Sequence, residues 1–385
     1  MNKVVAIGRT NGIVNVQRGR SGGRADRGAA YVKILVLNLG STSSKFGVFN
    51  DLDCVFSHTL RHPKEALQAL QGQEAHLQYR RQAVQEALEQ AGHPIPQFDV
   101  LALRGGLIRP VPGGIFVVDQ QVAEDARSER YGSHPSNLGL QMGWAWSQQY
   151  GIPAIFVDAP VTDELSDVAR ISGFAGTSRR SVFHALNAKR IIRLHAQQHN
   201  QPLADSRYIV AHMGGGITVG AFAGLRAIDV NNGVDGEGPF SPERTGYLSS
   251  RILLDLVDKH GGDTQAVYTM LYKRGGLQSY FGTNDVQLLC QRAQHEPEVR
   301  LVLDGMIYQV AKQIGAMAVA LEGRVQGILI TGGLAYAKDV TDALTQLVKW
   351  IAPCSIYPGE DELAALAEGA FRYYNKQEEA HHLGD

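Results

Sequence analysis

The sequence predicts an α/β protein built from two related lobes. The prediction comes from two segments, ILVLNLGSTSSKF at 34–46 and YIVAHMGGGITVGAF at 208–222. In each, a run of aliphatic residues ends at a turn rich in Gly, Ser or Thr, and apolar residues resume soon afterwards. This pattern indicates a strand, a turn whose open backbone N–H groups can approach an anion, and a return strand. Because the hairpin occurs twice, we expect two similar lobes with a nucleotide cleft between them.

Size and composition agree with this fold and exclude several classes of partner. A chain of 385 residues is too long for one ordinary core, and 44% hydrophobic with 19% charged residues is typical of a globular protein. The formal net charge of −1 gives no general attraction to nucleic acid or to an anionic membrane, and no apolar run reaches the length of a membrane span. Three cysteines at unrelated spacings suit a reducing compartment, so we expect a cytoplasmic protein.

The chain is expected to divide into an extension and two lobes. Residues 1–30 are rich in Lys and Arg, and we interpret them as a disordered basic extension or the product of an upstream start codon. An arm that binds nucleic acid or another polyanion is the alternative. Residues 31–200 are assigned to an N-terminal lobe, joined by a C-terminal helix in 357–385. Residues 201–356 are assigned to a C-terminal lobe.

Helices and strands alternate along the first lobe. Residues 64–91 have helical periodicity and end at the stop signal Gly92-His93-Pro94. The apolar run at 98–103 predicts a buried strand that leads directly into Arg104. Residues 137–150 predict a second helix, and the run at 152–160 predicts a strand that ends near Asp158.

The second lobe repeats this alternation. After the hairpin at 208–230 we expect helices near 247–260 and 296–322, and then a strand at 327–333. The segment at 359–374 predicts a final helix that returns to the first lobe. Strands that alternate with helices imply an α/β architecture with ligand groups at the strand ends.

Glycine-rich turns indicate the kind of phosphate site. The Walker A and GxGxxG patterns are both missing from the sequence, which removes the main support for P-loop and Rossmann folds. Three separate turns occur instead, LNLGSTSS at 37–44, HMGGG at 212–216 and TGGLAY at 331–336. One such turn can simply reverse the chain, but here each closes a predicted strand. This is the layout of the actin-like ATPase (ribonuclease H-like) fold shared by actin, Hsp70 and sugar kinases, in which two lobes clamp ATP.

Longer motifs resemble one family. VLNLGSTSSKFGVF is similar to the opening of acetate kinases, Asn-x-Gly-Ser-x-Ser-x-Lys-Phe. Further stretches, in the same order along the chain, resemble the butyrate kinase branch of the short-chain carboxylate kinase (acetokinase) family. They include RGGLIRPVPGGIFVVD (104–119), FVDAPVTDEL (156–165), FHALNAK (183–189), IDVNNGVDGEGPFSPERTG (228–246), ILITGGLAYAK (328–338) and YPGEDELAALAEGA (357–370). The resemblance covers residues 32–374.

The resemblance implies a reaction. ATP, with Mg²⁺, would phosphorylate butyrate reversibly to butyryl phosphate plus ADP, by direct in-line transfer to the carboxylate. A carboxylate is already ionised at neutral pH, so the site needs positive charge, alignment and a metal rather than a general base. The alternatives are a kinase for isobutyrate, propionate or acetate, a sugar kinase with Asp158 as its base, or a non-catalytic ATP switch. The family also implies a homo-oligomer, a dimer or higher.

The resemblance assigns catalytic and metal-binding residues. Arg104 and Arg244 would hold the substrate carboxylate and the phosphoryl oxygens, for which the guanidinium fork is suited. His184 would stabilise the transferring phosphoryl group, and His134 would lie near the phosphates. Asp158, Glu362 and Asn38 would hold Mg²⁺ and its waters, and Glu360 and Asp361 are alternatives to Glu362.

The resemblance also assigns the nucleotide and acyl sites. The nucleotide-binding set comprises Asn38, Gly40, Ser41, Ser43, Lys45, His212, Gly214, Gly215, Gly216, Asp285, Gly332 and Gly333. Gln287 and Leu334 depart from the acetate kinase pattern near the adenine, so the base preference stays open. Phe183 is expected to form a wall of the acyl pocket, and the small Ser133 would leave room for a chain longer than acetate. Because each buried CH₂ is worth about 0.8 kcal/mol, such a pocket should favour butyrate over acetate.

Overall fold

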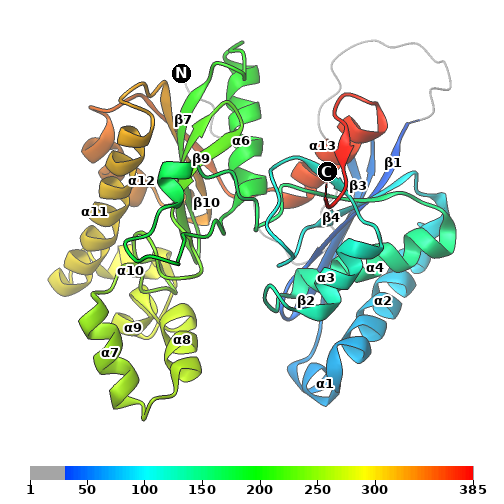
Figure 1. The fold of residues 1–385 in the computed structure, drawn as a ribbon, viewed down its shortest axis with the longest axis horizontal. Coiled ribbons are helices and arrows are strands. Elements are labelled where there is room, and N and C mark those ends of the chain that lie inside the picture. Colours follow the sequence, from blue (N-terminus) through cyan, green and yellow to red (C-terminus); the bar gives the residue numbers. More distant parts are fainter. Residues whose placement is uncertain (1–30, 385) are drawn as a thin grey trace. The chain divides into compact units, whose positions relative to one another are not determined.

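The structure is a computed structural model of the chain, and it describes residues 31–384. The basic extension predicted for residues 1–30 lies outside the described residues. From Val32 onward, strands and helices alternate and form two mixed sheets, one of seven strands and one of five (Figure 1).

The first sheet is built around the first predicted hairpin. Its strand order is β12-β5-β6-β4-β1-β2-β3. The strands are β1 (Lys33–Leu39), β2 (Ser43–Asn50), β3 (Asp53–Arg61), β4 (Val100–Arg104), β5 (Ile115–Val117), β6 (Ala154–Val157) and β12 (Ala380–His381). Strand β1 pairs antiparallel with β2 and parallel with β4, and β4 pairs parallel with β6. The carboxyl ends of β1, β4 and β6 therefore meet at one edge, which is where ligand groups gather in such sheets.

The second sheet repeats this arrangement. Its order is β11-β10-β7-β8-β9. The strands are β7 (Arg207–Met213), β8 (Ile217–Ala223), β9 (Arg226–Val230), β10 (Gly327–Gly332) and β11 (Cys354–Pro358). Strand β7 pairs antiparallel with β8 and parallel with β10, as β1 does with β2 and β4. The duplicated hairpin predicted from the sequence is thus confirmed.

Helices cover both faces of the first sheet. They are α1 (Lys64–Ala69), α2 (Gly72–Gln90), the 3₁₀ helix η1 (Ile95–Gln97), α3 (Gln120–Ser128), α4 (Pro135–Tyr150) and α13 (Glu362–Tyr374), with the short α5 (Asp167–Arg170) farther along the chain. Because successive side chains of a strand point to opposite faces, Leu35 and Leu37 of β1 pack in a cluster with Trp146 of α4. Ile34 and Val36 pack with residues of α13 on the other face. The C-terminal helix therefore packs on the sheet formed by the start of the chain.

Helices also pack on both faces of the second sheet. The helices of this part of the chain are α6 (Ala185–Gln198), α7 (Ser250–Lys259), α8 (Thr264–Lys273), α9 (Gly276–Phe281), α10 (Val286–Arg292), α11 (Pro297–Ala320), η2 (Gly333–Tyr336) and α12 (Lys338–Val348). Ile209 of β7 packs with α11 and α12, whereas Tyr208 packs with Ile192 of α6. Helix α6 thus packs on the second sheet although it precedes residue 200. The lobe boundaries stay a prediction, and this packing would move the first one ahead of residue 185.

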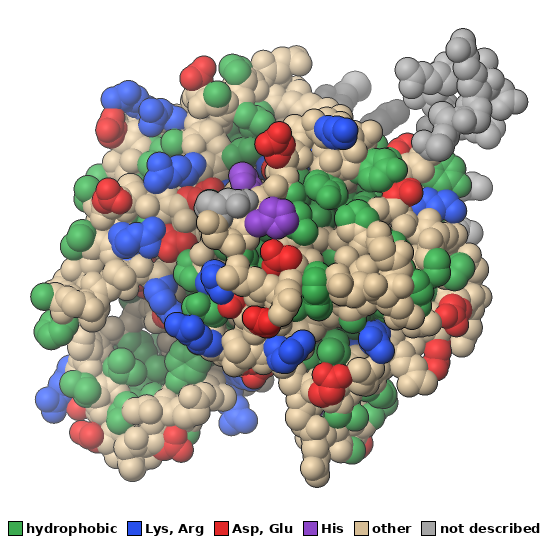
Figure 2. Space-filling view, turned by 45° about the vertical axis from the view of Figure 1, so that its right-hand side comes forward, with side chains coloured by type: hydrophobic (Ala, Val, Ile, Leu, Met, Phe, Trp, Pro, Cys, Tyr) green, Lys and Arg blue, Asp and Glu red, His purple; other side chains and the backbone are tan. Residues whose placement is uncertain are grey.

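The described helices and the face drawn in Figure 2 can be compared with the hydropathy and charge of the sequence. Among the described residues, every helix is too short or too polar to cross a bilayer. On the face drawn in Figure 2, Lys and Arg side chains are interspersed with Asp and Glu. This mixture matches the net charge of −1.

Two glycines of α4 test how closely this helix packs on the first sheet. A Cβ added at Gly143 would lie 2.2 Å from Leu103 Cδ1, and Leu103 is fully buried, whereas a Cβ at Gly139 would meet only Leu39 Cδ1 at 3.6 Å. We predict that Gly143→Ala lowers the free energy of unfolding by about 1–3 kcal/mol through overpacking. Gly139→Ala should leave it unchanged or raise it by up to about 1 kcal/mol, because Ala favours helix. Urea unfolding of both variants checks this, and equal effects would contradict the packing.

Candidate functional site

A buried arginine holds the turn between β1 and β2 through hydrogen bonds to its carbonyl oxygens. Arg80 of α2 is 2% exposed, and its guanidinium donates to the carbonyl oxygens of Gly40 (3.0 Å), Ser41 (2.6 Å) and Ser43 (3.0 Å). Burial lowers the pKa of Arg80 below its ordinary value. The turn closes on itself through Gly40 N–H, which donates to Ser43 O at 2.8 Å. The carbonyls of this predicted phosphate turn are thus occupied, and Lys45 is exposed on β2 opposite Asn38.

Three predicted site residues meet at the edge of the first sheet. Glu362, the first residue of α13, accepts a hydrogen bond from Asn38 Nδ2 of β1. Its other oxygen lies 3.0 Å from Arg104 Nη2, at the end of β4. These residues are distant in sequence, and the parallel pairing of β1 with β4 brings the two strand ends together. The result is a carboxylate held by one cation and one amide.

Glu360 lies between this cluster and the second sheet. Its Oε2 is 3.4 Å from His212 Nε2. Burial, followed by the charge of Glu362, raises the pKa of Glu360, and Arg104 opposes this effect. Within the described residues no group of three or more His, Cys, Asp or Glu is arranged to hold a metal. Mg²⁺ beside phosphates usually needs only one or two carboxylates plus water, so Glu360 and Glu362 fit that ion.

Two predicted histidines are stacked at the second sheet. The rings of His184 and His212 have centroids 3.8 Å apart and are tilted by 7°. Asn187 Nδ2 donates to His212 Nδ1 at 2.9 Å and also lies 3.1 Å from Thr331 Oγ1, while His184 Nδ1 lies 2.9 Å from Thr218 Oγ1. Because Nδ1 of neutral His212 accepts, its proton sits on Nε2. Asn187 and Thr218 therefore orient the pair.

The site histidines are neutral for electrostatic reasons. Burial, then Arg104 and Arg244, lowers the pKa of His212 to about 3. The same causes lower the pKa of His134 to about 4. For His184, burial acts first, and electrostatic coupling to His212 and to the two arginines then holds its pKa well below the ordinary value. These imidazoles consequently act as neutral N–H donors, and the positive charge of the site comes from arginine.

His134 forms the start of α4. Its Nδ1 accepts from the backbone N–H of Ser136 at 3.1 Å, and Pro135 occupies the first helical position. Capping by a side-chain acceptor satisfies one of the open N–H groups at a helix start. The cap leaves the remaining proton of neutral His134 on Nε2.

The glycines of the second turn make room for Arg244. A Cβ added at Gly216 would lie 2.3 Å from Arg244 Nη1. Gly214 N–H donates to Gly216 O at 3.0 Å, and Gly215 O accepts from Ser241 Oγ at 2.6 Å. The turn is therefore tied to the segment that carries Arg244.

Arg244 is a partly buried cation without an acidic partner in the described part of the chain. Its Nη1 donates to Gly233 O and its Nη2 to Tyr272 Oη at 3.2 Å, and the guanidinium lies 4.5 Å from the centroid of the Tyr272 ring. Its Nε is buried and has no hydrogen-bond partner among the described residues. A cation in this state favours an anionic ligand.

Asp158 lies in a different environment from the Asn38–Glu362 pair. It follows β6 with a φ of +42°, and its side chain is fully buried. One oxygen accepts from Gly114 N–H at 2.9 Å and lies 3.5 Å from Lys189 Nζ, and the other lies 3.5 Å from Arg193 Nη1. Two cations thus neutralise the carboxylate, and its assignment to metal binding stays a prediction.

The third turn and Asp285 have clear structural roles. Gly332 has a φ of +90°, and a Cβ there would lie 2.4 Å from Met213 O, so glycine is required. Gly333 opens η2 and has free space around it. Asp285 is exposed and caps α10 by accepting from Leu288 N–H at 3.0 Å. Their nucleotide contacts stay predictions.

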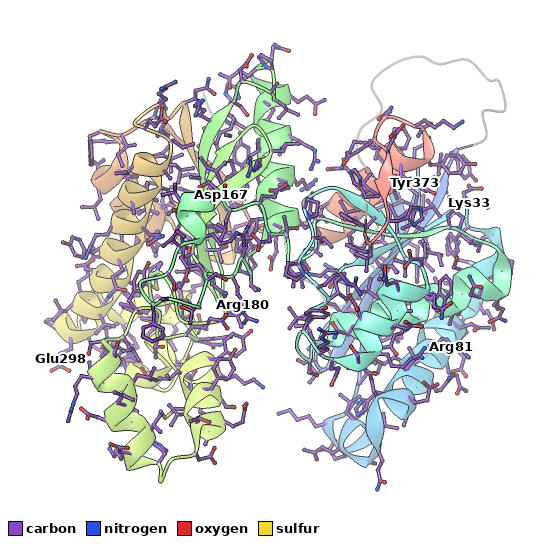
Figure 3. All side chains as sticks on the ribbon, viewed as in Figure 1. Lys33, Arg81, Asp167, Arg180, Glu298 and Tyr373 are labelled. Atoms are coloured by element: carbon purple, nitrogen blue, oxygen red, sulfur yellow. The ribbon has the colours of Figure 1, made fainter. Side chains whose placement is uncertain are left out.

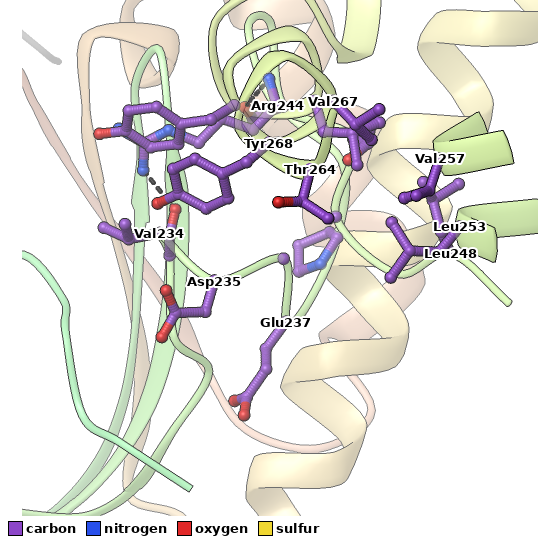
Figure 4. A pocket seen from close by; sticks show the side chains of 18 of the residues that line it. Val234, Asp235, Glu237, Arg244, Leu248, Leu253, Val257, Thr264, Val267 and Tyr268 are labelled. Carbon is purple, nitrogen blue, oxygen red and sulfur yellow. Dashed lines mark hydrogen bonds between the residues drawn. The ribbon is translucent and has the colours of Figure 1, made fainter. Parts of the chain in front are cut away.

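The two residues expected to line the acyl pocket have different surroundings. Phe183 is 5% exposed and packs against Phe222 in the core, whereas Ser133 donates to Glu129 at 2.8 Å on the surface. Their contact with an acyl chain stays a prediction. A cavity of about 620 Å³ lies beside Arg244, between the loop at 233–248 and helices α7 and α8 (Figure 4).

Sequence reasoning missed Arg80, Asn187 and Thr218. A signal existed for Arg80, because it occupies the buried face of α2 together with Leu77 and Val84, where an arginine needs a partner. Asn187 lay within the quoted FHALNAK motif and Thr218 within the second hairpin. Their roles depend on hydrogen bonds to residues that are distant in the sequence, and the spacing of residues along the chain does not reveal such bonds.

Known proteins resemble this chain in sequence and in fold. The acetokinase family model matches residues 165–351. A probable butyrate kinase of Enterococcus faecalis is 42% identical over 348 residues, which cover 90% of this chain and 96% of that protein. Solved structures of an acetate kinase of Entamoeba histolytica (TM-score 0.71, 17% identity) and a propionate kinase of Francisella tularensis (TM-score 0.70, 16% identity) each match 88% of this chain over 98% of their own. At such identities they show the fold alone, and they confirm the two-lobe actin-like α/β class.

The buried neutral histidines predict a pH dependence of stability. The pKa of His212 is near 3 when folded and ordinarily 6.5, so the unfolded chain binds the proton more readily. Stability linked to His212 is therefore present above pH 6.5 and is lost as the pH falls toward 3. We predict that His212→Gln reduces the loss of unfolding free energy between pH 6.5 and 5 by about 1.5 kcal/mol. Urea titrations of both proteins measure this, and parallel pH profiles would contradict it.

Proposed function

Because this chain belongs to the acetokinase family, we propose that it transfers the terminal phosphoryl group of ATP, with Mg²⁺, to the carboxylate of butyrate. The products are butyryl phosphate and ADP, and the reaction is reversible. The family supports a phosphotransferase with a carboxyl acceptor, and the name of the Enterococcus relative supports butyrate as the acid. The solved acetate and propionate kinases share only the fold with this chain, so their substrates do not indicate which acid this protein prefers.

One observation carries the proposal, the missing carboxylate partner of Arg244. Its Nη1 and Nη2 donate to uncharged acceptors, and its Nε is buried without a partner among the described residues. A carboxylate substrate would supply both the missing acceptor and the missing charge. A sugar substrate would instead need a free carboxylate base, and Asp158 is bound by Lys189 and Arg193.

Each residue of the site then has a role that follows from its geometry. Arg244 would orient the acid, and in-line alignment is the main requirement of such a transfer. His184 and His212 would donate neutral N–H groups to the transferring phosphoryl oxygens, and Thr218 and Asn187 hold their rings. Arg104 would add positive charge from the end of β4.

The nucleotide and metal would bind at the glycine turns and the carboxylates. Mg²⁺, when bound, would offset the negative charge of the phosphates. Glu362 and Glu360 would hold it with its waters, and Asn38 orients Glu362. We further propose that the two lobes close around ATP and that the protein acts as a cytoplasmic homo-oligomer, as the family resemblance suggests.

Acyl phosphate formation tests the proposal. In a hydroxamate assay with ATP, Mg²⁺ and butyrate, we predict that Arg244→Ala lowers kcat/KM at least 100-fold, because the acid loses its counter-charge. ATP affinity, measured by calorimetry, should stay within about threefold, because Arg244 is assigned to the acid.

Arg251→Ala is the matched control. Arg251 lies on α7, its side chain is 85% exposed, and it pairs only with Asp255 of the same helix. This variant should keep wild-type turnover. Equal activity of the two variants, or no product from the wild-type protein, would refute the assignment.

A further inference from the structure

In the turn between β1 and β2, every carbonyl oxygen of residues 40–43 accepts a hydrogen bond. Three of them accept from the guanidinium of Arg80, namely those of Gly40, Ser41 and Ser43. The carbonyl oxygen of Thr42 accepts from the backbone N–H of His62 at 2.9 Å. A carbonyl oxygen carries partial negative charge and repels an anion unless a donor covers it. The hydrogen bonds therefore remove a source of repulsion from the turn.

The N–H groups at the tip of the same turn are open. Ser41 and Thr42 are exposed, and their N–H groups have no backbone partner among the described residues. Successive open N–H groups in a turn form a concave site for an anion. The turn thus combines open donors with occupied acceptors, which is the arrangement that a phosphate group requires.

Arg80 also places a positive charge next to the turn. It is 2% exposed, and no carboxylate in the described part of the chain pairs with it. Its Nε is buried without a hydrogen-bond partner there. Arginine stays charged in proteins, and a buried charge is screened less by salt than an exposed one. The charge of Arg80 therefore favours an anion at the turn.

Neighbours of the turn fix the guanidinium of Arg80. Ser44 Oγ is fully buried and lies 3.3 Å from Arg80 Nη1 and 2.9 Å from His62 Nε2. Burial, followed by the charge of Arg80, lowers the pKa of His62, so its imidazole is a neutral partner. The planar fork of Arg80 is thus held in one orientation, and a lysine ammonium cannot reproduce this geometry.

We propose that Arg80 is a positioning residue for the nucleotide: without touching ATP, it holds the β1–β2 turn in the conformation that binds a phosphate group. This inference rests on the proposed function, in which the turn contacts ATP. It assigns control of ATP affinity to α2, a helix that carries none of the residues assigned to phosphoryl transfer. Loss of Arg80 should therefore raise KM for ATP and leave kcat and the KM for butyrate nearly unchanged.

The test compares Arg80→Lys with a matched control, Arg81→Lys. Lysine keeps the positive charge but cannot form the same fork of hydrogen bonds. Arg80→Lys should raise the Kd for ATP, measured by calorimetry, by about tenfold or more, while kcat at saturating ATP stays within about threefold of wild type. Arg81 is the next residue of α2 (Figure 3) and is half-buried. The hydrogen bonds from described residues of α2 to the turn come from Arg80, so Arg81→Lys should keep the wild-type Kd.

Adenosine separates a role at the phosphate turn from a general structural role. It has the base and the ribose of ATP but no phosphate group, so Arg80→Lys should leave its Kd unchanged. A variant with a damaged fold would lose affinity for both ligands equally. A rise in the Kd for ATP of less than about tenfold, or equal losses for ATP and adenosine, would overturn the inference.

NMR of the wild-type protein keeps the inference testable if Arg80→Lys does not fold. ATP should shift the backbone amide resonances of Ser41 and Thr42, adenosine should not, and the Nη protons of Arg80 should stay protected from exchange in both complexes. Amide resonances that do not respond to ATP, or an Arg80 side chain that is released when ATP binds, would overturn the inference.

The outcomes separate this inference from the proposed function. If the wild-type protein binds ATP but yields no acyl hydroxamate, the proposed function fails, and the comparison of Arg80→Lys with Arg81→Lys still decides the role of Arg80. If the wild-type protein forms butyryl phosphate but both variants bind ATP equally well, the inference fails alone. If the wild-type protein binds no ATP, both fail.

Discussion

The site depends on one partly buried cation, Arg244, whose Nε is buried without a hydrogen-bond partner among the described residues. Arg244 lies against Gly216, is held by Gly233 O and Tyr272, and keeps an Nε without a partner. A buried N–H without an acceptor is costly, so a ligand that supplies an acceptor and a negative charge is favoured here. Burial, followed by the charges of Arg104 and Arg244, lowers the pKa of His212 and of His134 and keeps both rings neutral. The positive charge of the site therefore comes from two arginines.

The fold brings these groups together by using one pattern twice. In both sheets a hairpin strand pairs with its successor and, in parallel, with a later strand. Strand ends from distant parts of the sequence therefore meet, as Asn38 and Arg104 do at Glu362. The carboxylate of Glu360 then extends this cluster to His212. The proposed metal site is therefore assembled from strand ends that are distant in sequence, beside the glycine turns assigned to the nucleotide.

The sequence was sufficient for features that depend on local patterns. Aliphatic runs that end at glycine turns predicted both hairpins, and Arg104 was expected at the end of a buried strand, where β4 does end. The pairing of Asp158 with Lys189 and Arg193 was not predictable, because it joins β6 to α6 across the fold. Arg80 was missed because its role depends on the carbonyl groups that it contacts in the turn between β1 and β2, and these lie far from it in the sequence. The cavity was missed because it arises from the packing of a loop against α7 and α8.

Arginines thus provide the positive charge of the site, while its histidines stay neutral. ¹⁵N NMR of the imidazole nitrogens in the ligand-free protein between pH 7.5 and 5 tests this division of roles. We expect His134, His184 and His212 to keep the shifts of neutral rings throughout, with the proton of His134 and His212 on Nε2. Titration of any of the three near pH 6.5 would contradict it, because a charged histidine would then share the role assigned to Arg244.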